Sequence, residues 1–255
     1  MAASVALGQN PMRCTASSVP PTIRATGRTE LVSDLVLTCS GGTPTALGQP
    51  VPQGTISVIL DTPITSRLLA SGWSEALLLV DEPASGTQVV CANAAGVCSL
   101  QGNGNGTGIY DGSVGRANVY QGQPASGNEV DFVSIPLDPP GTNGTRTFRI
   151  TNIRADATAA AAAGKINMQV GTIESTTLSV NTSAAVANAQ TPVSFSVKSV
   201  QSGPQGITQF AVSVAEKFAT VFRTRTKAPP AGNNQSPTPA AQNTPPPGLA
   251  PVLPS

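Results

Sequence analysis

The sequence contains no histidine, and only 11% of its 255 residues are charged, whereas an ordinary soluble domain has about 25%. The missing histidine removes the usual base of serine and cysteine hydrolases and the commonest metal ligand. The 14 basic and 13 acidic residues leave a net charge of +1, so no strong field attracts nucleic acid or an anionic membrane. We therefore expect no nucleic-acid partner.

Long apolar runs are also missing. No run approaches the ~18 apolar residues of a transmembrane helix, so we expect no membrane span. The opening MAASVALGQN is apolar, and Ala6-Leu7-Gly8 fits a small-x-small cleavage site but lacks a preceding positive region. Residues 1–18 are interpreted either as the remnant of a signal peptide or as an N-terminal arm.

The four cysteines, Cys14, Cys39, Cys91 and Cys98, form no Cys-x-x-Cys pair, which argues against zinc-ribbon and thioredoxin-type sites. An even number of cysteines in a chain of low charge is typical of an oxidising compartment. Because both pairs flank short, turn-rich stretches, we expect disulfides between Cys14 and Cys39 and between Cys91 and Cys98. Four free buried thiols in a cytoplasmic protein are the alternative.

The dominant hydrophobic period is two, which predicts half-buried strands. Apolar side chains alternate in residues 35–39, 56–60, 148–150, 166–170, 193–197 and 210–214. Turn residues such as SGGTPT, GNGNGTG and DPPGTNGT separate these stretches. We expect an all-β fold, an antiparallel β-sandwich of Greek-key, immunoglobulin-like type over residues 19–227. The low-complexity stretch near residue 160 is a candidate subdivision into two smaller sandwiches.

Three segments depart from simple alternation. EALLLVDEP at 75–83 is a continuous apolar run, which predicts a central strand covered on both faces. VAEKFATVFRTRT at 214–226 favours a short C-terminal helix, with a strand as the alternative. Residues 228–255 are rich in proline and free of charge, so they predict an extended, disordered tail or linker.

Four sequence words in this order resemble a known module: ELVSDLVLTCSGG, ITSRLLASGWSEALLLVDEP, IPLDPPGTNGTRTFRITNIRA and AEKFATVFRTRT. They are similar to the N-terminal β-sandwich module of large exported proteins of soil bacteria, which often carry immunoglobulin-like repeats. The resemblance covers most of residues 19–227 and includes no catalytic signature. It implies export and an extracellular or cell-surface location.

Candidate catalytic and metal sites are weak. GNGNGTG at 102–108 lacks the following helix and lysine of a phosphate loop, so a hairpin tip is expected. Asp111, Asp131 and Asp138 lie near turns but form no calcium-loop pattern. The only concentrated acids, Glu75, Asp81 and Glu82, bracket a single strand, whereas a glycosidase needs two carboxylates at a defined separation. We expect no catalytic residue, no metal and no cofactor.

Trp73 is the only tryptophan, and with Tyr110 or Tyr120 it could form a stacking platform for sugars. Buried, it would instead fill the core. The composition favours a non-enzymatic, exported structural or adhesive module of the cell surface or extracellular matrix, and a carbohydrate-binding module is the alternative. The expected partners are neighbouring β-sandwich modules, surface proteins or glycans.

Overall fold

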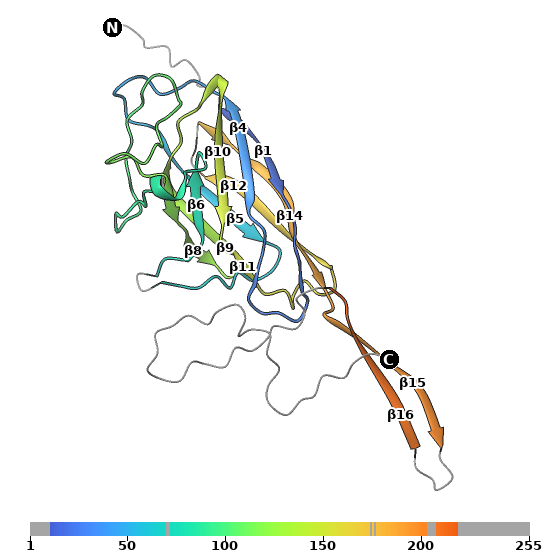
Figure 1. The fold of residues 1–255 in the computed structure, drawn as a ribbon. Coiled ribbons are helices and arrows are strands. Elements are labelled where there is room, and N and C mark those ends of the chain that lie inside the picture. The colour runs from blue at the N-terminus through green and yellow to red at the C-terminus, as the bar shows by residue number, and fades with distance from the viewer. Residues whose placement is uncertain (1–10, 70–71, 174, 176, 203–207, 219–255) are drawn as a thin grey trace. The chain divides into compact units, whose positions relative to one another are not determined.

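The computed structural model describes residues 11–69, 72–173, 175, 177–202 and 208–218 (Figure 1). Within these ranges the chain forms strands, one 3-10 turn at Ser85–Thr87 and no α-helix. The strands are β1 Met12–Ser18, β2 Thr22–Arg24, β3 Glu30–Leu31, β4 Leu35–Gly41, β5 Gln53–Leu60, β6 Leu77–Val80, β7 Val119–Gln121, β8 Gln123–Ser126, β9 Glu129–Pro136, β10 Gly141–Thr151, β11 Arg154–Ala155, β12 Lys165–Ile173, β13 Leu178–Ser179, β14 Asn181–Gln190, β15 Val193–Ser202 and β16 Thr208–Glu216. The all-β prediction is confirmed.

Two six-stranded sheets make up most of the first unit, which ends at Pro192. Their strand orders are β13-β1-β4-β10-β6-β7 and β2-β14-β12-β5-β9-β8, and one of the two is curled into a half-barrel. Both sheets are mixed, because β13 runs parallel to β1 and β2 runs parallel to β14. The expectation of purely antiparallel sheets is therefore corrected. Parallel neighbours need a long connection, and more than a hundred residues separate each of these pairs along the chain.

The core is built from the alternating apolar positions. In β5, Ile56, Val58 and Leu60 are fully buried, and β12 buries Ile166 and Met168 in the same way. These two strands pair with each other, and the opposite sheet contributes the apolar side chains of β4, β6 and β10 to the same hydrophobic core. The period-two pattern therefore predicted β5 and β12 together with their buried faces.

The strand within EALLLVDEP, β6, is shorter than expected, and burial alternates along it. β6 has neighbours on both edges, β10 and β7. Leu78 and Val80 are buried, but Leu77 and Leu79 on the other face are only half-buried. The prediction of a strand with partners on both sides is confirmed, and that of complete cover on both faces is wrong.

The N-terminal arm is part of the fold from residue 12 onwards. β1 pairs with β4 over six residues, with Cys14 directly opposite Cys39, and Met12 is fully buried. The cross-strand disulfide and the paired backbone hold Met12–Ser18 in the sheet, so this part of the expected N-terminal segment lies in the first unit. Residues 1–10, which include the expected cleavage site, lie outside the described residues.

Two irregular segments keep the second half of the first unit compact. β10 ends at Thr151, and Asn152 adopts a positive φ of 60° before Ile153 turns back into the core. The positive φ of Asn152 thus separates β10 from β11 and lets Ile153, which is out of phase with Phe148 and Ile150, be buried. The alanine-rich stretch near residue 160 forms turns within the first unit, with Ala157 and Ala160 buried.

The second unit begins at Val193, and its described part is the hairpin of β15 and β16. Residues 214–216 belong to β16, so the helix expected from residue 214 does not begin there. The pairing of Val214 with Phe195 explains the difference, because cross-strand hydrogen bonds outweigh a weak local helix preference. The remainder of the helix segment beyond Phe218, and the proline-rich tail, lie outside the described residues.

Candidate functional site

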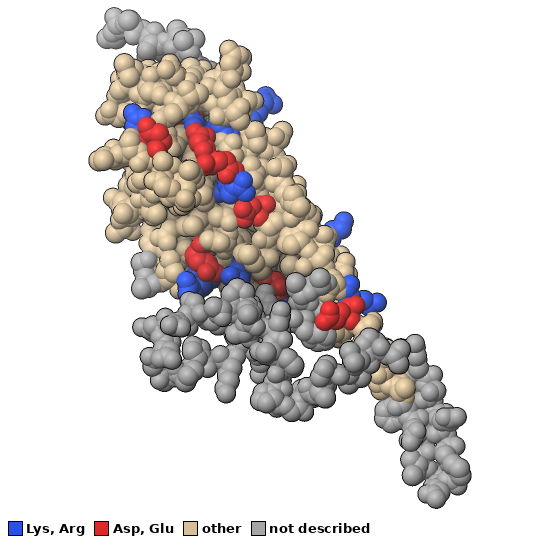
Figure 2. Space-filling view, viewed as in Figure 1, with Lys and Arg blue, Asp and Glu red and all other residues tan. Residues whose placement is uncertain are grey.

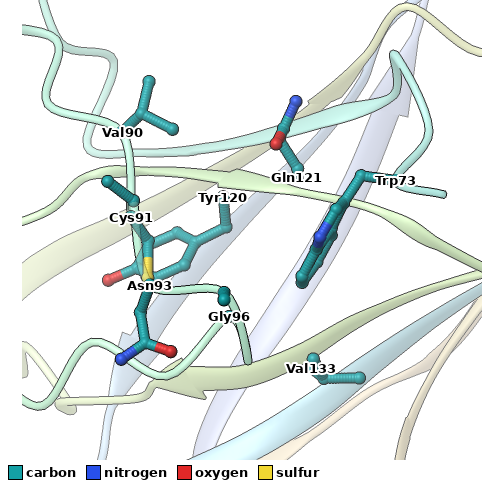
Figure 3. Close-up of a pocket in the computed structure, with 10 residues that line it drawn as sticks. Trp73, Val90, Cys91, Asn93, Gly96, Tyr120, Gln121 and Val133 are labelled. Carbon is teal, nitrogen blue, oxygen red and sulfur yellow. The ribbon is translucent and has the colours of Figure 1, made fainter. Parts of the chain in front are cut away.

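A pocket of about 210 Å³ lies between the loop before β6, the loop 90–96, β7 and β9. Trp73 lies on one side of it and the ring of Tyr120 on the other, as Figure 3 shows. Asn93 and Gln121 contribute side-chain amides, and Val133 of β9 adds an apolar wall. Polar and apolar groups contribute about equally to its lining, so it is more polar than most small-molecule sites, which are mainly apolar with a few polar groups.

The loop that covers this pocket is closed by a disulfide. Cys91 and Cys98 are bonded, and the Cys91 N–H donates to the Val119 carbonyl of β7 at 2.8 Å. Inside the loop, the Asn93 side-chain oxygen accepts the Ala95 N–H at 2.8 Å. The disulfide and the turn therefore fix the loop against the sheet, where it forms one side of the pocket.

Gly96 lets the loop lie close to the indole. Its φ is +72°, and a Cβ at this position would lie 2.7 Å from the Cη2 atom of Trp73. Any other residue would strain the turn and push against the ring. On its other side, Trp73 is fixed by its backbone, because its carbonyl accepts the Leu69 N–H at 2.7 Å and the next residue, Ser74, donates to Gly122 at 2.8 Å. The half-buried indole is thus held in one place with part of its face open.

Tyr120 forms a rigid wall and brings no charge. It is only 2% exposed, and its hydroxyl donates to the Ala117 carbonyl at 3.1 Å. Burial raises the pKa of Tyr120 above its ordinary value, with a smaller contribution from Tyr110. At neutral pH the phenol is therefore protonated, and at 2% exposure Tyr120 gives the pocket an uncharged wall with little open ring surface.

Tyr110 does not take part in this pocket. Its hydroxyl donates to the Pro136 carbonyl at 2.5 Å and accepts the Asp138 N–H at 3.0 Å. The guanidinium of Arg146 lies over its ring, 4.3 Å from the centroid. Because Tyr110 lies outside the lining of this pocket and the guanidinium covers its ring, it offers no stacking surface there. Of the three predicted aromatic residues, the structure brings only Trp73 and Tyr120 together.

The acids singled out by sequence each contact an arginine. Asp81 bonds to the fully buried Arg146, Glu82 bonds to Arg149 at 2.6 Å, and Glu75 bonds to Arg154 at 2.9 Å. None of the three acids lines the pocket. On the face shown in Figure 2, charged side chains accordingly occur in small groups of both signs on a largely uncharged surface.

Arg146 is the centre of a buried polar cluster. Besides Asp81, its guanidinium donates to the backbone carbonyls of Gly106 and Asp138. Asp138 is also fully buried, and its Oδ1 accepts the Thr45 N–H at 2.7 Å. These bonds join the loop 102–108 and the loop before β5 to β10. The loop 102–108, for which a hairpin tip was expected, is therefore held against the fold through the Gly106 carbonyl.

Asp111, Asp131 and Asp138, which were considered as calcium ligands, each accept hydrogen bonds from different partners. Asp111 accepts the backbone N–H and the hydroxyl of Ser113, which lower the pKa of its carboxyl, and Asp131 accepts the Ser57 hydroxyl at 2.5 Å. Asp138 belongs to the arginine cluster. Among the described residues, no three His, Cys, Asp or Glu side chains gather as a metal site would require.

Sequence reasoning missed the polar part of the pocket and the role of Arg146. Asn93 and Gln121 carry no sequence signal that separates them from other amides of the chain. The glycine within the short Cys91–Cys98 loop was the one available clue, since a positive φ or a close approach often explains such a glycine. Arg146 lies among alternating strand residues and was not distinguishable from a solvent-facing position.

Comparison of the chain with protein-family models, with curated proteins and with solved structures found no match. In the part of the chain that the structure covers, no helix has the length and apolar character needed to cross a membrane.

Proposed function

We propose that this chain is a non-enzymatic, exported structural or adhesive module of the cell surface or extracellular matrix. Within this proposal its two sheets form a sandwich of the Greek-key, immunoglobulin-like type. The resemblance to the N-terminal module of exported soil-bacterial proteins supports export, and two disulfides in a chain of low charge are consistent with an oxidising environment.

The observation that carries the proposal is the pairing of the concentrated acids with arginines. A hydrolytic site needs carboxylates that converge on a cavity with room for substrate and water. Here Glu75, Asp81 and Glu82 instead bond to Arg154, Arg146 and Arg149. Each of these arginines lies on β10 or β11, so the acids tie neighbouring segments of the fold together. Their chemistry is that of structural contacts.

Protease treatment of intact cells tests the export part of this proposal. We expect peptides of the module in the fraction released from unbroken cells, with all four cysteines protected from thiol reagents. Detection of the module only after lysis, with free thiols, would contradict export. A loss of measured hydrolytic turnover in a folded Glu82→Gln protein would contradict the non-enzymatic assignment, because that substitution removes a carboxylate and keeps its shape.

A second candidate function is carbohydrate binding, favoured by the pocket that Trp73 and Tyr120 line. An indole face packs on the C–H face of a sugar ring, and side-chain amides such as those of Asn93 and Gln121 bond to its hydroxyls. The volume of about 210 Å³ is below the roughly 300–1,000 Å³ of drug-sized sites. One sugar ring is therefore the size of ligand that we propose.

A glycan array followed by calorimetry tests this candidate. Trp73→Ala is expected to weaken binding at least about tenfold, since stacking on an open indole is a major contact. Gln121→Ala should also weaken binding, whereas Gln123→Ala, a matched change on β8 outside the pocket, should leave it unchanged. Binding that survives Trp73→Ala, or an array without any retained glycan, would contradict this candidate.

A further inference from the structure

Four apolar side chains form a continuous patch on one face of the β15–β16 hairpin. The register places Phe195 opposite Val214 and Val197 opposite Val212, and alternate residues of a strand share a face. Their exposed fractions are 76% for Phe195, 63% for Val197, 51% for Val212 and 60% for Val214. This set, the apolar patch, has the composition of a core face but lies in contact with solvent.

We propose that the apolar patch is the surface through which two copies of this chain associate into a weak, reversible dimer. A hairpin of two strands has no second layer of its own and is at best marginally stable in water. Its outer edges pair with no other strand among the described residues. Two hairpins packed face to face would form a four-stranded, two-layer unit, the smallest arrangement that covers both patches.

The lack of charge on the patch favours a second copy of this chain over a charged protein as the binding partner. The four side chains of the patch are uncharged, and the nearest charge on the same face is Glu216, which pairs with Val193 at one end of the hairpin. In a twofold dimer the same patch faces itself, so any charge on it would meet a like charge. An uncharged patch avoids that repulsion and gives a charged partner no group to pair with. The composition of the four-residue patch therefore meets the requirement of self-complementarity.

The chain's own C-terminal residues are a poorer cover for the patch. Between residues 219 and 227, Val221 and Phe222 are the only large apolar residues, and Arg223, Arg225 and Lys227 follow them. Residues 228–255 contain no aromatic residue, and their only large aliphatic residues are Leu249, Val252 and Leu253. Prolines cannot donate to a strand ladder, so such a segment adds a strand poorly. A second hairpin, in contrast, brings four matching side chains at once.

The size of the patch sets the strength of the dimer. A fully buried phenylalanine covers about 150–250 Å², so the four side chains of both copies would bury on the order of 800 Å² in total. Stable complexes bury about 1,200–2,000 Å². Interfaces of about 1,600 Å² can be as weak as micromolar, so for this smaller patch we expect dissociation near 1 µM protein and a dimer at about 100 µM. The inference does not depend on the proposed function.

Sedimentation of the full 255-residue chain over this range of concentrations tests the proposal. The expected result is a shift from monomer to dimer. Val212→Asp should abolish the dimer, because it places two like charges within the interface. Ser213→Asp adds the same charge to the exposed opposite face of the same strand and should leave the dissociation constant within about twofold, as surface substitutions usually do.

A second variant separates lost contact from a misfolded hairpin. Val212→Thr combined with Val214→Thr keeps the branched shape and the strand preference but reduces the apolar area. We expect it to raise the dissociation constant about tenfold or more, which corresponds to about 1.4 kcal/mol. An unchanged constant in this variant would overturn the proposal.

A monomeric wild-type chain at about 100 µM, the concentration expected for a small interface, would also overturn it. If removal of residues 219–255 then produced a dimer, those residues would be the occupant of the patch instead. An equal loss of dimer in Val212→Asp and Ser213→Asp would overturn the proposed face, since only one of the two substitutions lies on it.

Discussion

β12 of the first unit and β15 of the second have the same sequence pattern and opposite surroundings. Ile166 and Met168 alternate with polar residues and are fully buried, whereas Phe195 and Val197 alternate in the same way and are largely exposed. β12 has a neighbour on each edge, β14 and β5, and faces a second sheet. β15 pairs with β16 alone among the described strands.

The difference shows which property the period of two encodes. Alternation of apolar and polar residues predicts an extended strand with its apolar side chains on one face. Whether that face is covered depends on another layer, which is built by residues far away in the sequence. In the first unit the chain supplies that layer itself. In the second unit the described residues do not.

Replacing one phenylalanine in each unit should give the largest contrast. Phe148 of β10 is fully buried, and Phe148→Ala should lower the free energy of unfolding by about 3–5 kcal/mol through lost burial and the cavity left behind. Phe195→Ala should change it by less than about 0.5 kcal/mol at low protein concentration, since exposed side chains contribute little. Urea unfolding of both variants measures the two values. Similar losses would show that Phe195 is buried within a single chain.

Two arginines of β10 allow the same comparison between a buried and a partly exposed charged side chain. Arg146 has a fully buried side chain, whereas that of Arg149 is 31% exposed. Arg146→Met should lower stability by about 3 kcal/mol, because it leaves the Asp81 carboxylate without its buried cation and the backbone carbonyls of Gly106 and Asp138 without their donor. Arg149→Met, which removes contacts to Asp34 and Glu82, should change stability by about 1 kcal/mol or less. Chemical denaturation can measure both, and equal effects would contradict the buried cluster.

The two disulfides extend the comparison from the sheet to the pocket loop. Removing Cys14–Cys39 by double substitution to alanine should cost about 3.5 kcal/mol, and removing Cys91–Cys98 about 2.5 kcal/mol, from the loop lengths that the bonds close. The first bond lies in a paired sheet with Cys39 fully buried, so mild reductant should open the second bond first. Timed thiol labelling in reductant measures the order. Prior labelling of Cys39 would contradict this assignment.

An alkaline titration of the tyrosines is expected to give the smallest effect, and its signal is specific to the first unit among the described residues. The chain has two tyrosines, both buried in the first unit, and burial raises the pKa of Tyr110 and of Tyr120. The unfolded chain ionises near pH 10 while the folded chain keeps both protons, so stability is unaffected below about pH 10 and falls above it.

Tyrosinate absorbance should therefore rise only together with the loss of near-ultraviolet circular dichroism. Ionisation near pH 10 with the dichroism intact would show that the phenols are accessible to solvent. The hairpin contains no tyrosine among its described residues, so this signal reports the first unit alone.

Local pattern was sufficient to predict β4, β5, β6, β10, β12, β15 and β16, the buried faces of β5 and β12 and both cysteine pairs. Composition could not place β1, since MRCTASS carries no clear apolar face and joins the sheet through its pairing with β4. The pocket was predictable only in part. Trp73 and Tyr120 line one cavity, whereas the ring of Tyr110 lies under Arg146. That contact joins segments far apart in the sequence, so no local pattern reveals it.

Hydrogen exchange of the full chain, followed by mass spectrometry at low and high protein concentration, tests the central comparison most directly. Amides of β5 and β12 should be strongly protected at both concentrations, because they lie inside a covered sheet. Amides of β15 and β16 should exchange rapidly at low concentration and more slowly at high concentration. Protection of the hairpin equal to that of β12 at low concentration would contradict the account, because its apolar face would then be covered within one chain.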